Sequence, residues 1–211
     1  MGRDIEDAGY RPEIIELVGV DGSGKSTLLR QLLAWERGIE APRVGTITFT
    51  RPPETWFRVA AERLELKGSA EGISLDLMFQ HALAWREKAC RDDVRAGSSG
   101  IKTLVLDRHV IGLGGYYGFL GVQGVPEMLK RLQFARPSRA VLLNVPVRTC
   151  LERIQARGGR VEHHEQTPKR LEMLDRANRA TLKAMDIPTL VVCPGMKNQA
   201  RSVREWIEPT S

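Results

Sequence analysis

The sequence predicts an α/β fold, with a five-stranded parallel sheet as the middle layer and helices on both faces. Short apolar or β-branched runs alternate with longer amphipathic stretches, and this alternation is typical of βαβ units. A glycine-rich turn separates the first apolar run from the first helical pattern, which is the context of a phosphate-binding loop. The chain has 211 residues, 42% of them hydrophobic, which is enough for one domain, residues 1–211, with a buried core.

Five strands are expected, because five short runs are rich in apolar or β-branched residues and end in turn or helix signals. They cover residues 13–18, 44–50, 102–106, 139–145 and 189–193. Seven helices are expected from apolar positions that recur with a helical period. They cover residues 25–35, 54–66, 75–95, 126–134, 147–156, 168–185 and 198–207. The sixth helix has a clear start, since Thr167 is a good N-cap and Pro168 a favoured first residue. Trp85 lies in a helical pattern and is expected in the core.

Composition and charge narrow the class of protein. No apolar stretch approaches the roughly 20 residues that a membrane span needs. The N-terminal residues are charged and lack the apolar segment of a secretion signal, and the three cysteines are scattered, as reduced thiols are. A cytoplasmic protein without membrane partners is therefore expected. The net charge of +6 fits either a nucleic-acid surface or a site for small polyanions. Without a basic run or a nucleic-acid module, small anions are favoured.

Residues 19–27 read GVDGSGKST and match the pattern G-x-x-x-x-G-K-[ST] directly after an apolar run. Glycines let backbone N–H groups surround phosphate oxygens, and the N-terminus of the following helix adds its positive dipole. Lys25 would reach the β- and γ-phosphates, and the Ser26 hydroxyl would bind Mg²⁺. The pattern therefore predicts a three-layer P-loop NTPase fold that binds a nucleoside triphosphate. The expected ATP contacts from this phosphate loop are Asp21, Gly22, Ser23, Gly24, Lys25, Ser26 and Thr27.

Charged residues follow two other strands at their carboxyl ends, where open α/β sheets bind ligands. Asp107 could hold Mg²⁺, and the adjacent Arg108 could brace a phosphoryl group during transfer. An ordinary solvated Asp-Arg pair is the alternative. Arg51, presented by the two prolines that follow it, is suited to bind the phosphate of an acceptor. A surface arginine before a turn remains the alternative there.

A glycine pair flanked by arginines, at residues 158–159, predicts a mobile lid over residues 153–165. Its arginines Arg153, Arg157 and Arg160 could fold over a triphosphate and exclude water. The alternative is a charged helix end, where arginines interact with the terminal carbonyl groups.

Together these residues resemble the thymidylate kinase family of P-loop nucleoside monophosphate kinases. The phosphate loop is similar almost letter for letter, including Asp21, and Asp107-Arg108-His109 is similar to the family's Asp-Arg-aromatic or Asp-Arg-His signature. Shorter similarities involve Thr50-Arg51-Pro52, Leu77-Met78-Phe79, Tyr116, the run 142–146, and Leu151-Glu152-Arg153. The resemblance covers residues 14–207, which is most of the chain.

The resemblance implies a function in nucleotide biosynthesis: transfer of the γ-phosphoryl group of ATP to a (deoxy)pyrimidine nucleoside monophosphate, dTMP or a modified relative. Mg²⁺ would accompany the ATP, and the enzyme would be a homodimer. The implied catalytic residues are Lys25, Asp107, Arg108, Arg157 and Arg160. The implied acceptor-binding residues are Asp21, Arg51, Phe79, Arg108 and Tyr116. Arg153 would bind ATP, and Ser26 and Asp107 would hold the metal.

Several positions depart from the family pattern. Some relatives carry an arginine in the phosphate loop at the position of Gly22, so here the lid arginines would have to neutralise the charge of the transition state. The family's base-contacting arginine corresponds to Leu83, and Arg86 follows one helical turn later. Residues 110–115, VIGLGG, replace hydroxyl and amide side chains. Because lost hydrogen-bond partners change discrimination strongly, the accepted base is expected to differ.

Three other functions stay open on the sequence alone. A kinase of a non-phosphorylated acceptor, such as a nucleoside or another small alcohol, would use Asp107 or Asp21 as the base and would not need Arg51. A nucleotide-dependent switch protein would use the loop without a transferred group, but the chain has no guanine-reading Asn-Lys-x-Asp motif. Action on a polynucleotide end would use the basic charge and would show a steep dependence on salt.

Overall fold

The computed structural model describes residues 12–36, 44–48, 75–95, 103–107, 109–157, 167–196 and 198–207. Within them, five parallel strands form one sheet in the order β2-β3-β1-β4-β5, which confirms the predicted fold class. The strands are β1 (Glu13–Val18), β2 (Val44–Thr48), β3 (Thr103–Asp107), β4 (Arg139–Leu143) and β5 (Thr189–Val192). Because β1 is the central strand, the phosphate loop at its carboxyl end emerges in the middle of the sheet.

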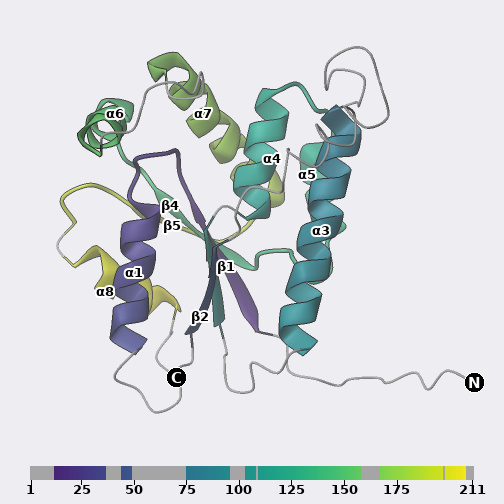
Figure 1. The fold of residues 1–211 in the computed structure, drawn as a ribbon, viewed down its shortest axis with the longest axis horizontal. Helices are drawn as coiled ribbons and strands as arrows, with labels where there is room; N and C mark the ends of the chain where they lie inside the picture. The colour runs from purple at the N-terminus through teal and green to yellow at the C-terminus, as the bar shows by residue number, and fades with distance from the viewer. Residues whose placement is uncertain are drawn as a thin grey trace, which may run out of the picture.

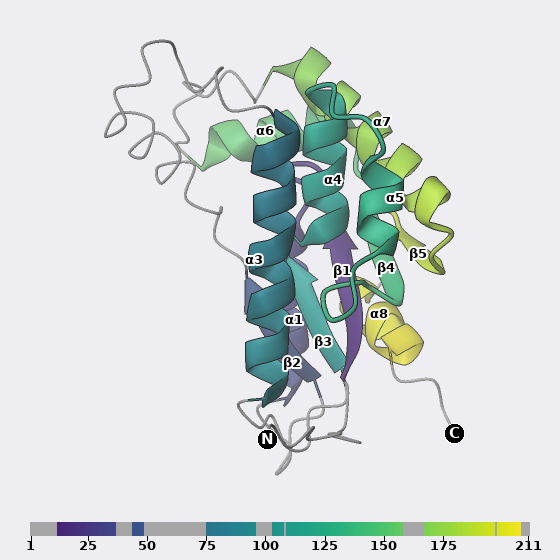
Figure 2. The same cartoon turned by 90° about the vertical axis from the view of Figure 1, so that its right-hand side faces the viewer.

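Helices cover both faces of this sheet (Figure 1). One face carries α1 (Lys25–Glu36) and α8 (Gln199–Ile207). The other carries α3 (Leu75–Arg95), α4 (Val110–Phe119) and α5 (Val125–Lys130). The remaining two are α6 (Val147–Ala156) and α7 (Pro168–Met185), which lie towards the edge where β1 leads into α1. Figure 2 shows α3, α4, α5 and α7 side by side on one face, with α8 behind the sheet.

Successive side chains of the central strand β1 point alternately into two apolar cores, one on each face of the sheet. Ile15 and Leu17 of β1 pack with Leu28 of α1 and Val203 of α8. The intervening residues Ile14 and Val18 point to the opposite face, into the core that contains residues of α3, α4, α5 and α7. This alternation follows from the two-residue period of a strand, and it places the central strand between two fully buried layers.

Helix α4 is absent from the predicted elements, because its sequence VIGLGGYYGF is rich in glycine, which is a poor helix former. The structure shows what these glycines do. A Cβ atom on Gly115 would lie 2.0 Å from Oδ1 of Asn178 in α7, and one on Gly114 would lie 2.9 Å from side-chain carbons of Val125 and Leu129. The glycines therefore allow close packing between helices, and tertiary contact outweighs the local propensity.

Two other expectations are wrong. The helix predicted over residues 126–134 ends at Lys130, because the Glu87 carboxylate accepts the backbone N–H groups of Gln133, Phe134 and Ala135 at 2.8–2.9 Å. Trp85 is 38% exposed and is not a core residue. The helix predicted over residues 54–66 lies outside the described residues. No described helix is long and apolar enough to cross a membrane.

Candidate active site

The phosphate loop closes on itself between β1 and α1. Gly22 and Gly24 have φ angles of 81° and 103°, which residues with a Cβ atom rarely adopt. The Lys25 ammonium donates hydrogen bonds to the carbonyl oxygens of Gly19 at 2.7 Å and Val20 at 3.0 Å. The loop thus holds its own cation at the head of α1, where the N-terminal backbone N–H groups also favour an anion.

Helix α6 packs directly against the phosphate loop. The Arg153 guanidinium donates from Nη1 to the carbonyl oxygens of Gly22 at 3.2 Å and Ser23 at 3.3 Å. A Cβ atom on Gly22 would lie 2.4 Å from the carbonyl oxygen of Cys150. Because backbone atoms cause this clash, no side chain fits at position 22 without movement of α6. The glycine that departs from some relatives is therefore required by the packing of this chain.

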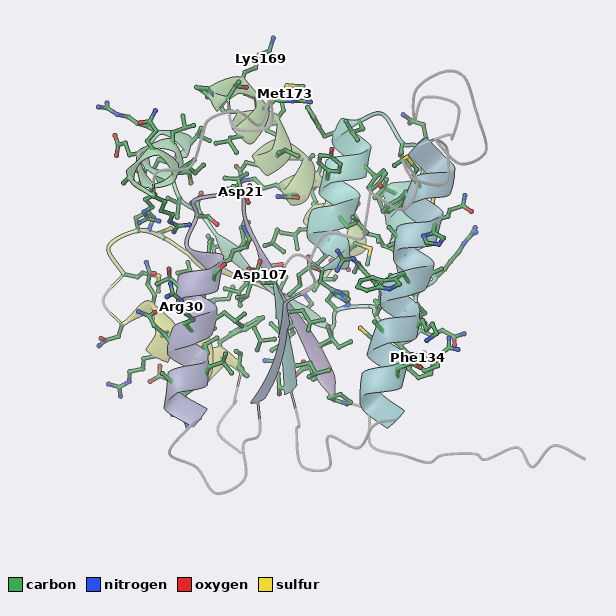
Figure 3. All side chains as sticks on the ribbon, in the orientation of Figure 1. Asp21, Arg30, Asp107, Phe134, Lys169 and Met173 are labelled. Atoms are coloured by element: carbon green, nitrogen blue, oxygen red, sulfur yellow. The ribbon has the colours of Figure 1, made fainter. Side chains whose placement is uncertain are left out.

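Asp107 lies at the carboxyl end of β3, and Figure 3 shows it between the phosphate loop and α4. It is 1% exposed, and its Oδ2 accepts a hydrogen bond from the Ser26 hydroxyl at 3.2 Å. Among the described residues its buried Oδ1 has no hydrogen-bond partner. A buried acceptor without a donor normally has a specific reason. Carboxylate and hydroxyl oxygens are the ligands Mg²⁺ prefers, so these two residues fit a magnesium ion.

The structure brings several other predicted residues to this edge of the sheet. Asp21 lies on the loop that leads from β1 to α1 (Figure 3). Arg157 is the exposed residue that ends α6. Phe79 is fully buried and packs against Tyr117, with ring centroids 5.0 Å apart, while Tyr116 meets the edge of Tyr117 at 5.6 Å. Outside the described residues lie Arg51, Arg108, Arg160 and most of the lid, residues 158–165.

Glu16, in the middle of β1, is a buried charged residue that is not among those predicted from the sequence. Its side chain is 0% exposed, and its two carboxylate oxygens accept the backbone N–H groups of Ile111 at 2.8 Å and Gly112 at 2.9 Å. Burial raises the pKa of Glu16 to about 7, against the opposing effects of these hydrogen bonds and of the Arg86 charge. The sequence does carry a sign of this role, because Glu16 is an acidic residue inside an apolar run. A buried acidic residue needs hydrogen-bond or charge partners.

Arg86 is also buried within this part of the molecule, at 2% exposure. Burial lowers its pKa to about 10, and the nearby Glu16 carboxylate is the main opposing influence. Leu83, at the position of the family's base-contacting arginine, is 4% exposed and belongs to the core. Arg86 is therefore a buried cation that is influenced by the Glu16 carboxylate.

His109, which follows the Asp107-Arg108 pair, is 0% exposed. Burial, together with the Arg86 charge, lowers the pKa of His109 to about 3. The imidazole is therefore neutral at physiological pH, and its Nε2 lies 2.6 Å from the carbonyl oxygen of Ala135. Because a carbonyl oxygen only accepts, Nε2 must carry the proton. His109 thus fastens the residues after β3 to the loop before β4.

Comparisons with known proteins agree with this arrangement. The thymidylate kinase family profile matches residues 17–204. A thymidylate kinase of Xanthomonas euvesicatoria pv. vesicatoria is 32% identical over 185 residues, which cover 83% of this chain and 73% of that protein. One from Leptospira interrogans is 26% identical over 202 residues, covering 94% of this chain and 93% of that protein.

The fold is also found in a solved structure. The crystal structure of thymidylate kinase from Ehrlichia chaffeensis aligns with a TM-score of 0.58 at 13% identity, covering 94% of this chain and 100% of that one. At this low identity the likeness concerns the fold alone. The family profile and the Xanthomonas relative extend over most of the sequence. The chain belongs to the thymidylate kinase family and is an enzyme of the nucleoside monophosphate kinase class.

Proposed function

We propose that this enzyme transfers the γ-phosphoryl group of ATP to dTMP or a modified deoxypyrimidine monophosphate, giving the diphosphate. The observation that carries the proposal is the 3.2 Å contact between Ser26, at the head of α1, and Asp107, at the end of β3. This contact joins the triphosphate-binding loop to a buried carboxylate that fits Mg²⁺. Thymidylate kinases, whose profile covers residues 17–204, supply the acceptor class.

The chemistry asks mainly for alignment and positive charge, because the phosphoryl group passes between two oxygens in line. Lys25 would exchange its bonds to the loop carbonyl groups for bonds to the β- and γ-phosphates. Ser26 and Asp107 would hold Mg²⁺, which would offset phosphate charge. With no side chain at Gly22, the remaining positive charge would come from Arg108 and from the lid arginines, Arg157 and Arg160.

The acceptor would lie on the α3 and α4 side of the phosphate loop. Asp21 would contact its sugar, and Arg51 with Arg108 would hold its phosphate. Phe79 and Tyr116 would border the base, although Phe79 is covered by Tyr117 in this conformation, so stacking on it requires these rings to move apart. The burial of Leu83 and of Arg86 supports an altered base specificity.

The decisive experiment measures ADP release from Mg²⁺–ATP with a panel of nucleoside monophosphates, the matching nucleosides and 5-substituted pyrimidine nucleotides. We expect turnover of dTMP or of a 5-substituted deoxypyrimidine monophosphate, and loss of that turnover in Lys25→Ala. Arg51→Ala should lower kcat/KM for the acceptor by at least tenfold while leaving the KM for ATP nearly unchanged. Turnover of a nucleoside with no monophosphate accepted, or an unchanged Arg51→Ala, would contradict the proposal.

We also propose that residues 1–211 act as one P-loop kinase domain with a lid over residues 153–165, and that the enzyme works as a cytoplasmic homodimer on small nucleotides. Light scattering coupled to size-exclusion chromatography should give about twice the monomer mass of 23.6 kDa. A monomeric mass at assay concentration would contradict the dimer.

A further inference from the structure

Glu16 occupies a place where an apolar residue would be expected. It lies on the central strand between Ile14 and Val18, on the same face of the sheet, and both neighbours belong to the core beneath α3 and α4. A carboxylate that is completely buried is costly unless charge and hydrogen bonds compensate for its lost hydration. The structure must therefore supply partners, and these partners show what the residue does.

Two of the partners are backbone N–H groups in the first turn of α4. Ile111 donates to Oε2 at 2.8 Å and Gly112 to Oε1 at 2.9 Å. Helix N-termini carry backbone N–H groups that have no acceptor within the helix, together with a partial positive charge. The N-cap residue of α4, His109, makes no capping hydrogen bond with its side chain. Glu16, on β1, thus supplies the hydrogen-bond acceptor that the side chain of the N-cap residue does not supply.

The hydrogen bonds from Glu16 hold the part of α4 that follows Asp107 in the sequence. Asp107 ends β3 and α4 begins at Val110, so the two elements are close along the chain. Sheet pairing fixes Asp107, since Leu17 lies opposite it in the register with β1. Glu16 fixes the first turn of α4. The end of β3 and the start of α4 are consequently held by neighbouring residues of one strand.

Arg86, on α3, is a buried positive charge that influences Glu16. It is 2% exposed, and its charge and that of Glu16 attract each other. The next residue of the same helix, Glu87, binds the loop before β4. The Arg86 charge also interacts with three other titratable groups of the described residues, Cys90, Tyr117 and His109. The Asp107 charge also acts on Glu16.

We propose that Glu16 is a positioning residue for phosphoryl transfer: it fixes the first turn of α4 and so holds the start of this helix in place beside Asp107 and the phosphate loop. The kinetic part of this inference rests on the proposed function. The structural part, the attachment of α4 to β1, does not. The Glu16 side chain is 0% exposed, so its effect should appear in kcat, while the affinity for ATP should change little.

The test compares Glu16→Gln with Glu13→Gln. Glu13 lies on the same strand and pairs with a partly buried arginine, Arg139, but at the edge far from the phosphate loop. We expect Glu16→Gln to lower kcat at least tenfold, with the KM for ATP changed less than threefold. Backbone N–H exchange at Ile111 and Gly112 should accelerate. Glu13→Gln should keep kcat within twofold of the wild type, since it changes stability without touching α4.

A double variant, Glu16→Leu with Arg86→Met, separates positioning from stability. Apolar replacement of a buried charge pair often restores stability, but it leaves the N–H groups of α4 without their acceptor. The double variant should therefore fold and still be slow. Wild-type kcat in the folded double variant, or in Glu16→Gln at a temperature where it is folded, would overturn the inference. If the wild type phosphorylates no nucleoside monophosphate, the proposed function fails, and unchanged exchange at Ile111 and Gly112 would separately refute the attachment.

Discussion

Glu16 and Asp107 are both almost completely buried carboxylates, yet their hydrogen-bond partners differ. Glu16 has a backbone donor on each oxygen. Asp107 has a hydroxyl on one oxygen and, within the described part of the chain, no hydrogen-bond partner on the other. A carboxylate whose oxygens are both satisfied holds structure, whereas one with a remaining oxygen is available to a cation. The number of hydrogen bonds to each carboxylate oxygen therefore distinguishes a structural carboxylate from one that can bind a cation. Burial alone does not distinguish them.

Asp107→Asn tests the metal-holding role. The amide keeps the shape of the side chain but removes the charge that would bind Mg²⁺, so we expect kcat to fall by about 100-fold, with saturation at higher Mg²⁺. The unfolding temperature without nucleotide should not fall, because a buried charge is removed along with the lost acceptor. Initial rates of the wild type and the variant, measured against Mg²⁺ concentration, test this role, and thermal unfolding of both proteins is the control. Unchanged magnesium dependence would contradict this role.

The pKa values of Glu16 and His109 predict opposite effects of pH on stability. The pKa of Glu16 is raised from 4.5 to about 7, so its contribution is complete below pH 4.5 and is lost as pH rises towards 7. The pKa of His109 is lowered from 6.5 to about 3, so its contribution is present above pH 6.5 and is lost as pH falls towards 3. Between pH 4.5 and 6.5 the two trends partly cancel in the wild type.

Glu16→Gln removes one of these opposing trends. The wild-type free energy of unfolding minus that of the variant should fall by about 3 kcal/mol between pH 4.5 and pH 7. Urea unfolding at a series of pH values measures this difference. A difference that is constant across the range would show that Glu16 titrates as it does in the unfolded chain.

At the scale of elements, helix α4 shows how a poor helix former is kept helical. Two of its glycines, Gly114 and Gly115, face partners that leave no room for a side chain, as Asn178 of α7 does at Gly115. The same stretch lacks the hydroxyl and amide groups expected from the family. In this chain the stretch is instead packed closely on α7 and α5.

Two alanine substitutions in α4 separate packing from propensity. A Cβ on Gly115 would lie 2.0 Å from Asn178 Oδ1, whereas the nearest atom to a Cβ on Gly118 is 3.9 Å away. Gly115→Ala should lower the free energy of unfolding by about 1–3 kcal/mol, because α7 has to move. Gly118→Ala should raise it by about 0.5–1 kcal/mol, since alanine favours the helix. Chemical denaturation of both variants measures this contrast, and equal effects would contradict it.

The strands and the helices α1, α3, α6 and α7 could be predicted because each carries its own period of apolar residues. The phosphate loop could be predicted because its glycines and lysine act within a few residues of one another. Helix α4, the early end of α5 and the role of Glu16 could not. Each depends on a partner far along the chain: Asn178 for Gly115, Glu87 for residues 133–135, and Ile111 for Glu16. Local patterns do not specify such distant partners.

At the scale of the molecule, Arg139 joins three elements at the edge of the sheet opposite the phosphate loop. Its guanidinium binds both oxygens of Glu13 in β1, donates to the carbonyl oxygens of Trp206 and Ile207 at the end of α8, and lies 4.8 Å from the Trp206 ring. Burial alone would raise the pKa of Glu13, but the hydrogen bonds from Arg139 and Ser138 hold it below its usual value. One side chain therefore ends α8 and fastens it to β1 and β4.

Arg139→Met should destabilise the whole fold, because it leaves two α8 carbonyl groups without this donor and a half-buried carboxylate without its cation. We expect a loss of about 1–3 kcal/mol in the free energy of unfolding. The loss should be the same by fluorescence and by circular dichroism if residues 1–211 unfold as one unit. Arg201→Met, whose partner Glu205 is exposed on the same helix, should cost less than about 1 kcal/mol. Comparable losses in the two variants would contradict the role of Arg139.

The contact between Gly22 and the backbone of Cys150 limits how this enzyme could evolve. An arginine at position 22 would add a positive charge beside the phosphates, but it cannot be acquired in one step while α6 lies 2.4 Å from where its Cβ would be. A displacement of α6 would have to come first, and that displacement would also remove the Arg153 bonds to the loop. Position 22 is therefore expected to keep a residue without a Cβ atom for as long as α6 keeps this contact.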